Sequence, residues 1–243
     1  MIKLVYCLRR VKTLSLREFQ EHWLEAHARF GRRLPGLRRY VQYHVLENDP
    51  IREAMAQAGV STVEPFDGIA MAWWDSLESM RELLDGNPLV AEALADEKLF
   101  IDHSRSVACV TEEHVVVEPQ SHTPIVLIEC LQRRSDISRE KFREHWRNHE
   151  HIGRRAHEMG LLMGYIQNDT LLGDAGRVAG LGSGQEPFDG IVAAYFHSVT
   201  AFKALVASPL ASQESYEDEK KFIDHSRSVD MLARRHVIRD VVR

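Results

Sequence analysis

The sequence predicts an α+β protein made of two similar units, whose antiparallel sheets pack together into one barrel-like β-core with helices outside. One observation is a repeat: residues 100–107 (Phe-Ile-Asp-His-Ser-Arg-Ser-Val) recur without change as residues 222–229. The other is the order of the predicted elements, which is β-α-β-β-α-β in each half of the chain. A lone four-stranded sheet of this kind leaves one face open, so two copies in one chain can cover each other.

The repeat extends along the whole chain. Short identical motifs recur 122 or 123 residues apart, namely Glu-His-Trp at 21–23 and 144–146, Pro-Phe-Asp-Gly-Ile at 65–69 and 187–191, and Asp-Glu-Lys at 96–98 and 218–220. The spacing shifts by one within the first helix, because Trp23 and His27 are four residues apart while Trp146 and His149 are three apart. We therefore predict a first unit at residues 1–119, a polar linker at 120–124 and a second unit at 125–243.

Each element of the first unit has its own signal. Residues 2–8 alternate partly between apolar and polar side chains, as a strand does. Ser15 and Glu18 form a capping-box pattern, so a helix is expected from about residue 15 to residue 30. The remaining expectations are strands at 37–46, 68–74 and 114–118, helices at 76–84 and 89–100, and a long connection at 48–65 with a short helix at 51–58. This order is that of the ferredoxin-like unit.

Composition excludes several classes of function. The chain has 243 residues, of which 44% are hydrophobic and 28% charged, as in ordinary globular proteins. Its net charge of -5 offers no basic surface to nucleic acid. No apolar run reaches the roughly 20 residues of a membrane span, and the first residues lack a signal-peptide pattern, so a cytoplasmic protein is expected. Three scattered cysteines, Cys7, Cys109 and Cys130, do not suggest a disulfide framework or a zinc site.

The first helix of each unit presents a candidate catalytic residue. Trp23 and His27 lie on one apolar stripe, at the i, i+3, i+4 spacing of a helix face that packs against a sheet. His149, near Trp146, is the counterpart in the second unit. Imidazole titrates near neutrality, so each histidine is a candidate general acid or base in a pocket between helix and sheet. The alternative is a core histidine that is hydrogen-bonded to a backbone carbonyl.

The repeated eight-residue stretch supplies further candidates. Its acid, imidazole and guanidinium groups are Asp102, His103 and Arg105 in the first unit and Asp224, His225 and Arg227 in the second. The aspartate could orient the histidine as a base while the arginine holds an anionic oxygen. Three other interpretations stay open: an Asp–Arg ion pair that pins a loop, an aspartate that caps a turn, or a symmetric seam between the units.

Aromatic residues on the predicted strands could form the walls of a ligand pocket. The third strand contains two adjacent aromatics in each unit, and alternate residues on a strand point to opposite faces. Aromatic walls with few polar groups suit a flat or ring-bearing ligand, whereas ordinary packing is the alternative. The residues we assign to the pocket are Trp23, Trp146, Tyr40, Tyr165, Trp73 and Tyr195.

Two other kinds of site are not supported. The glycine-rich residues 173–184 lie between predicted strands, without the helix start that a phosphate-binding loop needs, so a flexible connection is expected there. His22 and His27 are five residues apart and cannot share a metal ion on a regular helix, and no H-E-x-x-H motif is present. We expect no metal site.

In combination these motifs resemble the EthD-domain family of the dimeric α+β-barrel superfamily. The matching residues are Phe19, His22, Trp23 and His27, the run Pro-Gly-Leu-Arg-Arg-Tyr at 35–40, and Glu-Glu-His-Val at 112–115. The resemblance covers nearly the whole chain twice, and it implies a tandem protein in which a pseudo-dimer forms within one chain. Relatives on this fold include polyketide cyclases, muconolactone isomerase, cofactor-free monooxygenases and haem-dependent enzymes, so the fold alone does not determine the reaction.

Together these features predict a cofactor-independent enzyme of the lyase, isomerase or cyclase type, which acts by proton transfer on a small hydrophobic, aromatic or polyketide-like compound. His27 and His149 would move the proton, while Arg105 or His103 stabilises charge on an oxygen atom. Two alternatives stay open: a non-catalytic binding or accessory protein, and an enzyme that binds haem through a histidine. No nucleic acid or membrane partner is expected, and the pseudo-dimer could associate into a further homodimer.

Overall fold

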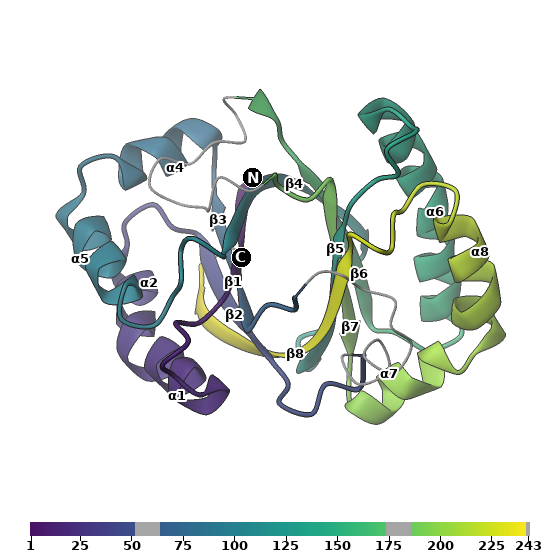
Figure 1. The fold of residues 1–243 in the computed structure, drawn as a ribbon, viewed down its shortest axis with the longest axis horizontal. Coiled ribbons are helices and arrows are strands. Elements are labelled where there is room, and N and C mark those ends of the chain that lie inside the picture. Colours follow the sequence, from purple (N-terminus) through teal and green to yellow (C-terminus); the bar gives the residue numbers. More distant parts are fainter. Residues whose placement is uncertain (52–63, 174–185, 242–243) are drawn as a thin grey trace.

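The computed structural model describes residues 1–51, 64–173 and 186–241, in which eight antiparallel strands close into one barrel (Figure 1). The strands follow the order β1-β3-β2-β8-β5-β7-β6-β4 around the barrel. The helices of the first half cover one side of the barrel, and those of the second half cover the opposite side (Figure 1). The expected α+β barrel within one chain is confirmed.

Each half contributes four strands. Those of the first half are β1 (Ile2–Leu8), β2 (Arg39–Val45), β3 (Gly68–Trp74) and β4 (Val107–Val117). Those of the second half are β5 (Ile125–Leu131), β6 (Gly164–Thr170), β7 (Gly190–Phe196) and β8 (Val229–Asp240). The strand expected at residues 114–118 is longer than predicted, because residues 107–112 pair with β1 and residues 111–117 pair with β6.

The helices lie between consecutive strands of each half. The first half has α1 (Leu16–Glu21), the π-helix η1 (His22–His27), α2 (Ala28–Arg33), α4 (Leu77–Leu84) and α5 (Pro88–Glu97). The second half has α6 (Arg139–Glu158), α7 (Val199–Val206), the π-helix η3 (Leu210–Ser215) and α8 (Tyr216–Glu219). The predicted capping box at Ser15 and Glu18 is confirmed. None of the described helices is both long and apolar enough to cross a bilayer.

Two of the sequence predictions concern segments that lie mainly outside the described residues. The short helix expected at residues 51–58 lies outside the described residues except for its first position. The glycine-rich connection at 173–184 also lies outside them, apart from Gly173.

The two halves are joined by strand pairing across the duplication. β2 of the first half pairs with β8 of the second, and β4 pairs with β6. These two pairings close the barrel, so neither sheet keeps a free edge that could pair with another chain. The repeated stretch is not this seam, because its backbone bonds to the end of β1 in its own half: Ile101 bridges Arg10, and the Asp102 amide donates to the Arg9 carbonyl.

A π-helix absorbs the one-residue difference between the halves. α6 is a continuous α-helix through Trp146 and His149, whereas the equivalent part of the first half is η1, which contains Trp23 and His27. An extra residue in a regular α-helix would turn everything after it by about 100°. A single π turn accommodates the insertion locally. His27 and His149 therefore keep equivalent positions despite their different spacing from the tryptophans.

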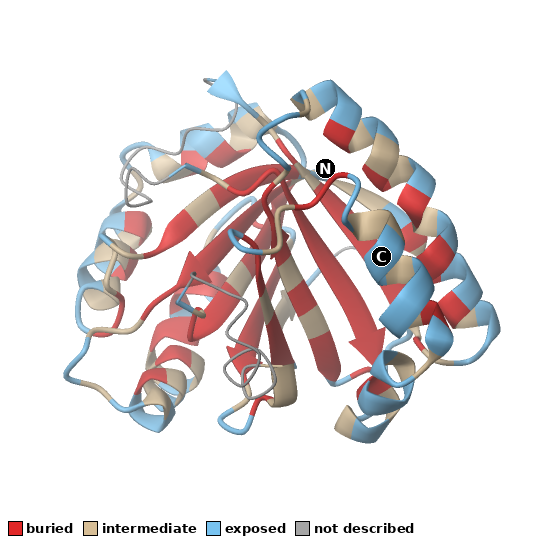
Figure 2. Ribbon diagram, turned by 45° about the vertical axis from the view of Figure 1, so that its right-hand side comes forward, coloured by how far each residue is buried: buried red, intermediate tan, exposed pale blue. Residues whose placement is uncertain are grey.

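Alternate residues of the strands fill two separate kinds of core. Inward side chains from all eight strands form one apolar cluster inside the barrel, while outward side chains pack against the helices. Figure 2 shows the strands as mostly buried, which is the pattern expected when both faces of a sheet are covered. The space between the outer sheet face and the helices is where both cavities described below are found.

Candidate active site

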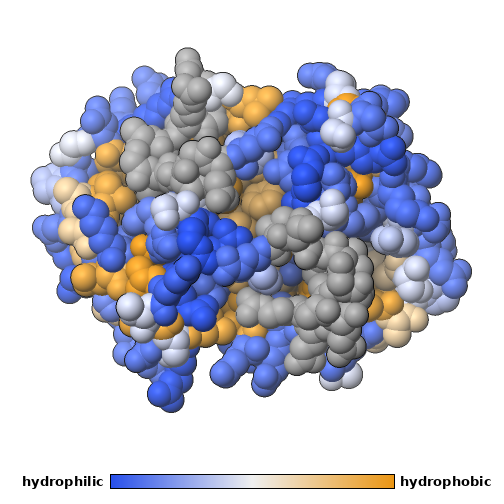
Figure 3. Space-filling view, viewed as in Figure 1, coloured by the Kyte–Doolittle hydropathy of each residue, from blue (hydrophilic) through white to orange (hydrophobic). Residues whose placement is uncertain are grey.

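Each half holds a cavity between the outer face of its sheet and its helices. The first has a volume of about 110 Å³ and includes His27 in its wall; the second has about 380 Å³ and includes His149. In the view of Figure 3 the surface near α2 and α5 includes hydrophobic residues, whereas that over α6 is mainly hydrophilic. The structure thus places both predicted histidines in a pocket between helix and sheet.

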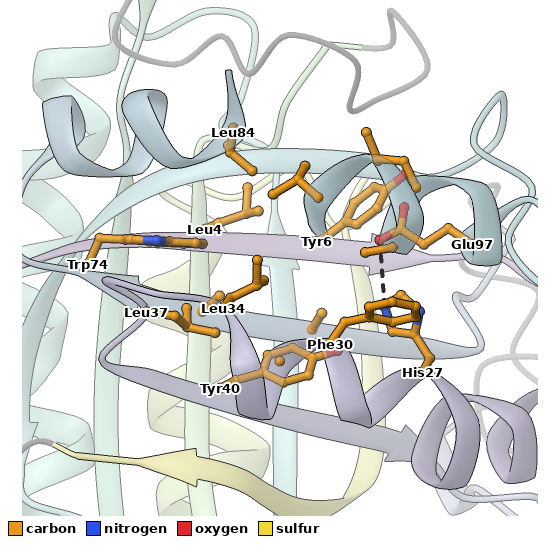
Figure 4. Close-up of a pocket in the computed structure, with 16 residues that line it drawn as sticks. Leu4, Tyr6, His27, Phe30, Leu34, Leu37, Tyr40, Trp74, Leu84 and Glu97 are labelled. Carbon is orange, nitrogen blue, oxygen red and sulfur yellow. Dashed lines mark ion pairs between the residues drawn. The ribbon is translucent and has the colours of Figure 1, made fainter. Parts of the chain in front are cut away.

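The first cavity has apolar walls and a small polar end. Figure 4 shows Tyr6, His27 and Glu97 gathered at one end, with Trp74 and Leu37 at the other. Apart from the indole of Trp74, the polar side chains among its described lining residues are Tyr6, His27, Tyr40 and Glu97. The apolar lining residues are Leu4, Phe30, Leu34, Leu37, Ala70, Ala72, Trp74, Leu84, Val90, Ala93 and Leu94.

His27 is oriented by a carboxylate of α5. Its Nδ1–H donates to Oδ2 of Asp96 at 2.8 Å, which leaves the Nε2 lone pair on the side of Glu97, whose Oε1 lies 3.7 Å away. Burial lowers the pKa of His27, and the hydrogen bond to Asp96 opposes this shift. Burial alone would raise the pKa of Asp96, but hydrogen bonds from His27 and His22 hold it below its usual value. His27 is therefore a neutral imidazole beside an ionised aspartate.

Glu97 has the opposite character to Asp96. Burial, together with the charge of Asp96, raises the pKa of Glu97 to about 8, so this carboxyl is mainly protonated at neutral pH. Its Oε2 lies 3.5 Å from Nε2 of His103, and Nδ1 of His103 is hydrogen-bonded to the Tyr6 hydroxyl at 2.7 Å. Burial also raises the pKa of Tyr6. Glu97, which can donate a proton, and Tyr6, which stays protonated and can donate a hydrogen bond, thus face the cavity beside the His27 imidazole, which can accept a proton.

The second half repeats this arrangement with changes. Nδ1 of His149 lies 2.7 Å from Oδ2 of Asp218, and Nε2 lies 3.8 Å from Oε1 of Glu219. The Ser215 hydroxyl is 3.3 Å from the same Nε2, where the first half has Ala93. In place of Tyr6, β5 presents Glu129 to the cavity.

The model of the EthD domain matches residues 12–104 and again residues 134–226. The protein belongs to the EthD domain family. Each matched segment contains one complete histidine–aspartate–glutamate set, so this EthD protein carries the domain and its candidate site twice. No curated protein sequence matches the chain.

Several solved structures with different names share the fold of the EthD tandem. An anthrone oxidase-like protein has a TM-score of 0.66 at 8% identity, covering 99% of this chain and 94% of that chain. A protein from Lactobacillus acidophilus NCFM with a provisional monooxygenase name has 0.56 at 10%, with 99% and 96% covered. A mutant chlorite dismutase from Candidatus Nitrospira defluvii has 0.52 at 8%, with 98% and 92% covered. At these identities the similarity shows the fold alone.

The donor groups in these cavities do not suit haem, which the sequence left open as an alternative cofactor. An axial histidine needs a free nitrogen with open space beyond it, whereas Nε2 of His27 faces Glu97 at 3.7 Å and Nε2 of His149 faces Ser215 at 3.3 Å. The two propionates of haem need basic partners, and none of the described lining residues is Arg or Lys. No group of three or more metal-binding side chains occurs among the described residues either.

The repeated eight-residue stretch forms a turn at the margin of the site. Oδ1 of Asp102 accepts hydrogen bonds from the backbone N–H and the hydroxyl of Ser104, and Arg105 pairs with Glu64 at 2.5 Å. Asp224 caps the equivalent turn and pairs with Arg227 at 2.7 Å. Only the histidines, His103 and His225, reach the cavity residues, through Glu97 and Glu219 respectively. The two arginines therefore do not lie where they could hold a substrate oxygen.

The predicted aromatic residues divide into three positions. Tyr40 and Tyr165 line the cavities, and Trp23 lies behind Tyr40, donating from its indole N–H to the Tyr40 hydroxyl at 3.0 Å. Trp146, buried in the outer core, is the counterpart of Trp23. Trp73 and Tyr195 point into the barrel interior, so the assignment of these two to the pocket is not what the structure shows. The side chain that reaches the first cavity is the adjacent Trp74, because strand alternation turns Trp73 inward.

The sequence reasoning missed the two carboxyl groups that complete each site. In the sequence, Asp96 and Glu97 stand out only as part of a repeated motif, and so do Asp218 and Glu219. The sequence feature that could have pointed to them is that the Asp-Glu pair recurs in both halves, at the end of a helix and shortly before the repeated stretch. Tyr6 and Glu129 carried no such signal, because they differ between the halves.

Proposed function

We propose that this EthD protein is an enzyme that catalyses proton transfer on a small hydrophobic, ring-bearing compound, in a lyase, isomerase or cyclase type of reaction without a metal or redox cofactor. The observation that supports this most directly is the pair formed by His27 and Glu97. The Nε2 lone pair of a neutral imidazole lies 3.7 Å from the oxygen of a carboxyl whose pKa is raised to about 8. Here burial lowers the pKa of the histidine and raises that of the carboxyl, and such shifts in neighbouring groups are typical of acid–base catalysis.

The shape and polarity of the first cavity define the compound it accepts. Aromatic and aliphatic side chains surround about 110 Å³, which suits one small ring system. The polar groups lie together at one end, so a ligand with a single carbonyl or phenol oxygen would place that oxygen beside Tyr6 and Glu97. A neutral cavity end also disfavours a substrate that is already charged.

The residues suggest a definite sequence of proton movements. Nε2 of His27 takes a proton from the carbon next to the carbonyl, and the electron pair moves onto the carbonyl oxygen. Glu97 gives its proton to that oxygen, while Tyr6 donates a hydrogen bond to it. The Asp96 carboxylate stabilises the imidazolium that forms. Return of the proton to a different carbon gives an isomerisation, and loss of a leaving group from the neighbouring carbon gives a lyase reaction.

Exchange of carbon-bound hydrogen tests the proposal without knowledge of the natural substrate. We expect the protein to accelerate the replacement of α-hydrogen by deuterium in small cyclic ketones such as 1-indanone or 1-tetralone, followed by proton NMR in D2O. The variants His27→Ala and His149→Ala, alone and together, divide the activity between the two halves. Loss of a general base lowers such rates about 10²- to 10⁴-fold.

The matched control is His114→Ala, which removes an imidazole that pairs with Glu150 at 2.7 Å and lines neither cavity. Exchange that persists unchanged in the folded double variant, as judged by circular dichroism, would contradict the role of the histidines. Tight binding of the ketones without any exchange would instead favour a non-catalytic binding protein.

A further inference from the structure

The two cavities of this EthD tandem have diverged in a consistent direction. At four aligned positions the first cavity has Tyr6, Val90, Ala93 and Leu94, whereas the second has Glu129, Ser212, Ser215 and Tyr216. Three apolar side chains have become hydroxyl-bearing ones, and a phenol has become a carboxyl. The volume rises from about 110 Å³ to about 380 Å³. The second cavity is thus adapted to a larger and more polar ligand.

The difference between Tyr6 and Glu129 is accompanied by a difference on the neighbouring strand. Tyr6 of β1 lies opposite Ala108 of β4, whereas Glu129 of β5 lies opposite Asp230 of β8. Glu129 is partly buried, and its side chain lines the cavity together with Glu219. Burial, with the charges of Asp230 and Glu219, raises the pKa of Glu129 well above its usual value. Carboxyls that share one cavity repel each other when they are ionised, which argues for a positively charged partner that the described lining does not supply.

The polar lining of this cavity can accept hydrogen bonds but offers no positive charge. It consists of the carboxyls Glu129 and Glu219, the imidazole of His149, the phenols Tyr165 and Tyr216, and two serine hydroxyls. Two lysines flank the cavity and are paired outside it, Lys221 with Asp218 at 2.8 Å and Lys220 with Glu217 at 2.6 Å; the Lys220 ammonium also lies 5.2 Å from the centre of the Tyr216 ring. An ammonium group supplies three donors and the missing charge. Leu127, Ile152 and Phe202 provide an apolar wall for the rest of the molecule.

We propose that the second cavity binds a small organic cation, an amine with an apolar body whose ammonium group is held by the carboxyls of Glu129 and Glu219. An anionic ligand would meet two carboxyls and no cation. A neutral ligand of the same shape would leave the carboxyls without a charged partner. The first cavity, with Tyr6 at this position, would not share the preference. The inference concerns binding alone and does not depend on the reaction proposed for the protein.

Calorimetry with benzylamine and 2-phenylethylamine tests the proposal, with benzyl alcohol as the neutral counterpart. We expect at least one amine to bind about tenfold more tightly than the alcohol. Binding should also release protons, because the ammonium group replaces a proton held by the carboxyls; titration in buffers of different ionisation enthalpy measures this release. The titratable groups around the site that could contribute are Glu129, Glu219, Asp230, Asp218, Asp49, His149 and His225.

Variants locate the binding site. Glu129→Gln should weaken amine binding about tenfold or more and abolish most of the proton release, and Glu129→Tyr, which restores the residue type of the first half, should do the same. Glu214→Gln is the charge-matched control, because Glu214 is exposed, pairs with Arg155 and does not line the cavity. The proposal fails if neither amine binds, if the alcohol binds as tightly, or if the folded Glu129 variants bind the amines as the unaltered protein does.

Discussion

Nδ1 of His27 donates to Asp96 at 2.8 Å across 69 residues of chain, and the same separation joins His149 to Asp218 at 2.7 Å. The two halves differ in helix type, cavity size and the residue opposite the histidine, yet this pair is the same in both. The pair determines which imidazole nitrogen faces the cavity, so it controls the availability of the proposed base.

Replacement of the orienting carboxylate should alter the pH profile of exchange as well as its rate. In Asp96→Asn the hydrogen bond and charge that raise the pKa of His27 are weakened, so burial lowers that pKa further. The acid limb of the profile, which reports protonation of the base, should move to lower pH, and the rate should fall about tenfold or more. Asp75→Asn, at the exposed Arg38 pair, is the control. A fall in rate with an unmoved limb would mean that Asp96 acts only on stability.

Glu97 should make the protein less stable as the pH rises. Its pKa in the folded state, about 8, is above the ordinary value of 4.5, so the folded protein binds more protons than the unfolded chain between these values. Stability therefore falls through this window. Glu97→Gln removes the effect, and its advantage over the unaltered protein should grow by roughly 1–4 kcal/mol from pH 5 to pH 8. Urea unfolding at the two pH values measures it; an advantage that is independent of pH would show that Glu97 is already ionised.

The π-helix should tolerate a deletion that its α-helical counterpart cannot. Removal of the exposed Glu25 leaves three residues from Trp23 to the histidine, as in α6, so η1 can become a regular α-helix with the histidine still facing Asp96. We expect a change of at most about 1 kcal/mol in the free energy of unfolding. Deletion of the exposed Asn148 from α6 has no bulge to absorb it and should cost about 3 kcal/mol or more, through loss of register in the buried face. Equal losses from both deletions would contradict this account.

Gly31 is required by the close approach of Tyr40. A Cβ at Gly31 would overlap the Tyr40 ring, and a Cβ at Gly153 would lie 2.6 Å from the ring of Tyr165. Gly31→Ala should therefore displace Tyr40 from the cavity wall and cost about 1–3 kcal/mol. The double variant Gly31→Ala/Tyr40→Leu should recover part of that loss by removing the overlap. Thermal unfolding checks both changes, and a Gly31→Ala protein of unaltered stability would show that the ring can move freely.

The sequence by itself determined what local pattern and internal repetition can encode. Identical motifs at a spacing of 122 or 123 residues established the duplication, and helical and strand periodicities placed most of the elements. The apolar stripe on the first helix located His27 and His149 in a helix–sheet pocket. These features depend on residues that are neighbours in the chain or copies of one another, so no knowledge of distant contacts was needed.

Only the tertiary structure decided which distant groups meet at each histidine. Asp96 and Glu97 reach His27 because α5 packs against η1, and Tyr6 joins them from β1; helix periodicity gives the direction of a side chain but not its partner. The same holds for Trp73, whose inward direction depends on the strand's register, and for Arg105, which pairs with Glu64. Closure of the barrel likewise depends on pairing between strands that are distant in the sequence, β2 with β8 and β4 with β6. Such contacts are set by packing of the whole chain, which no local stretch of sequence specifies.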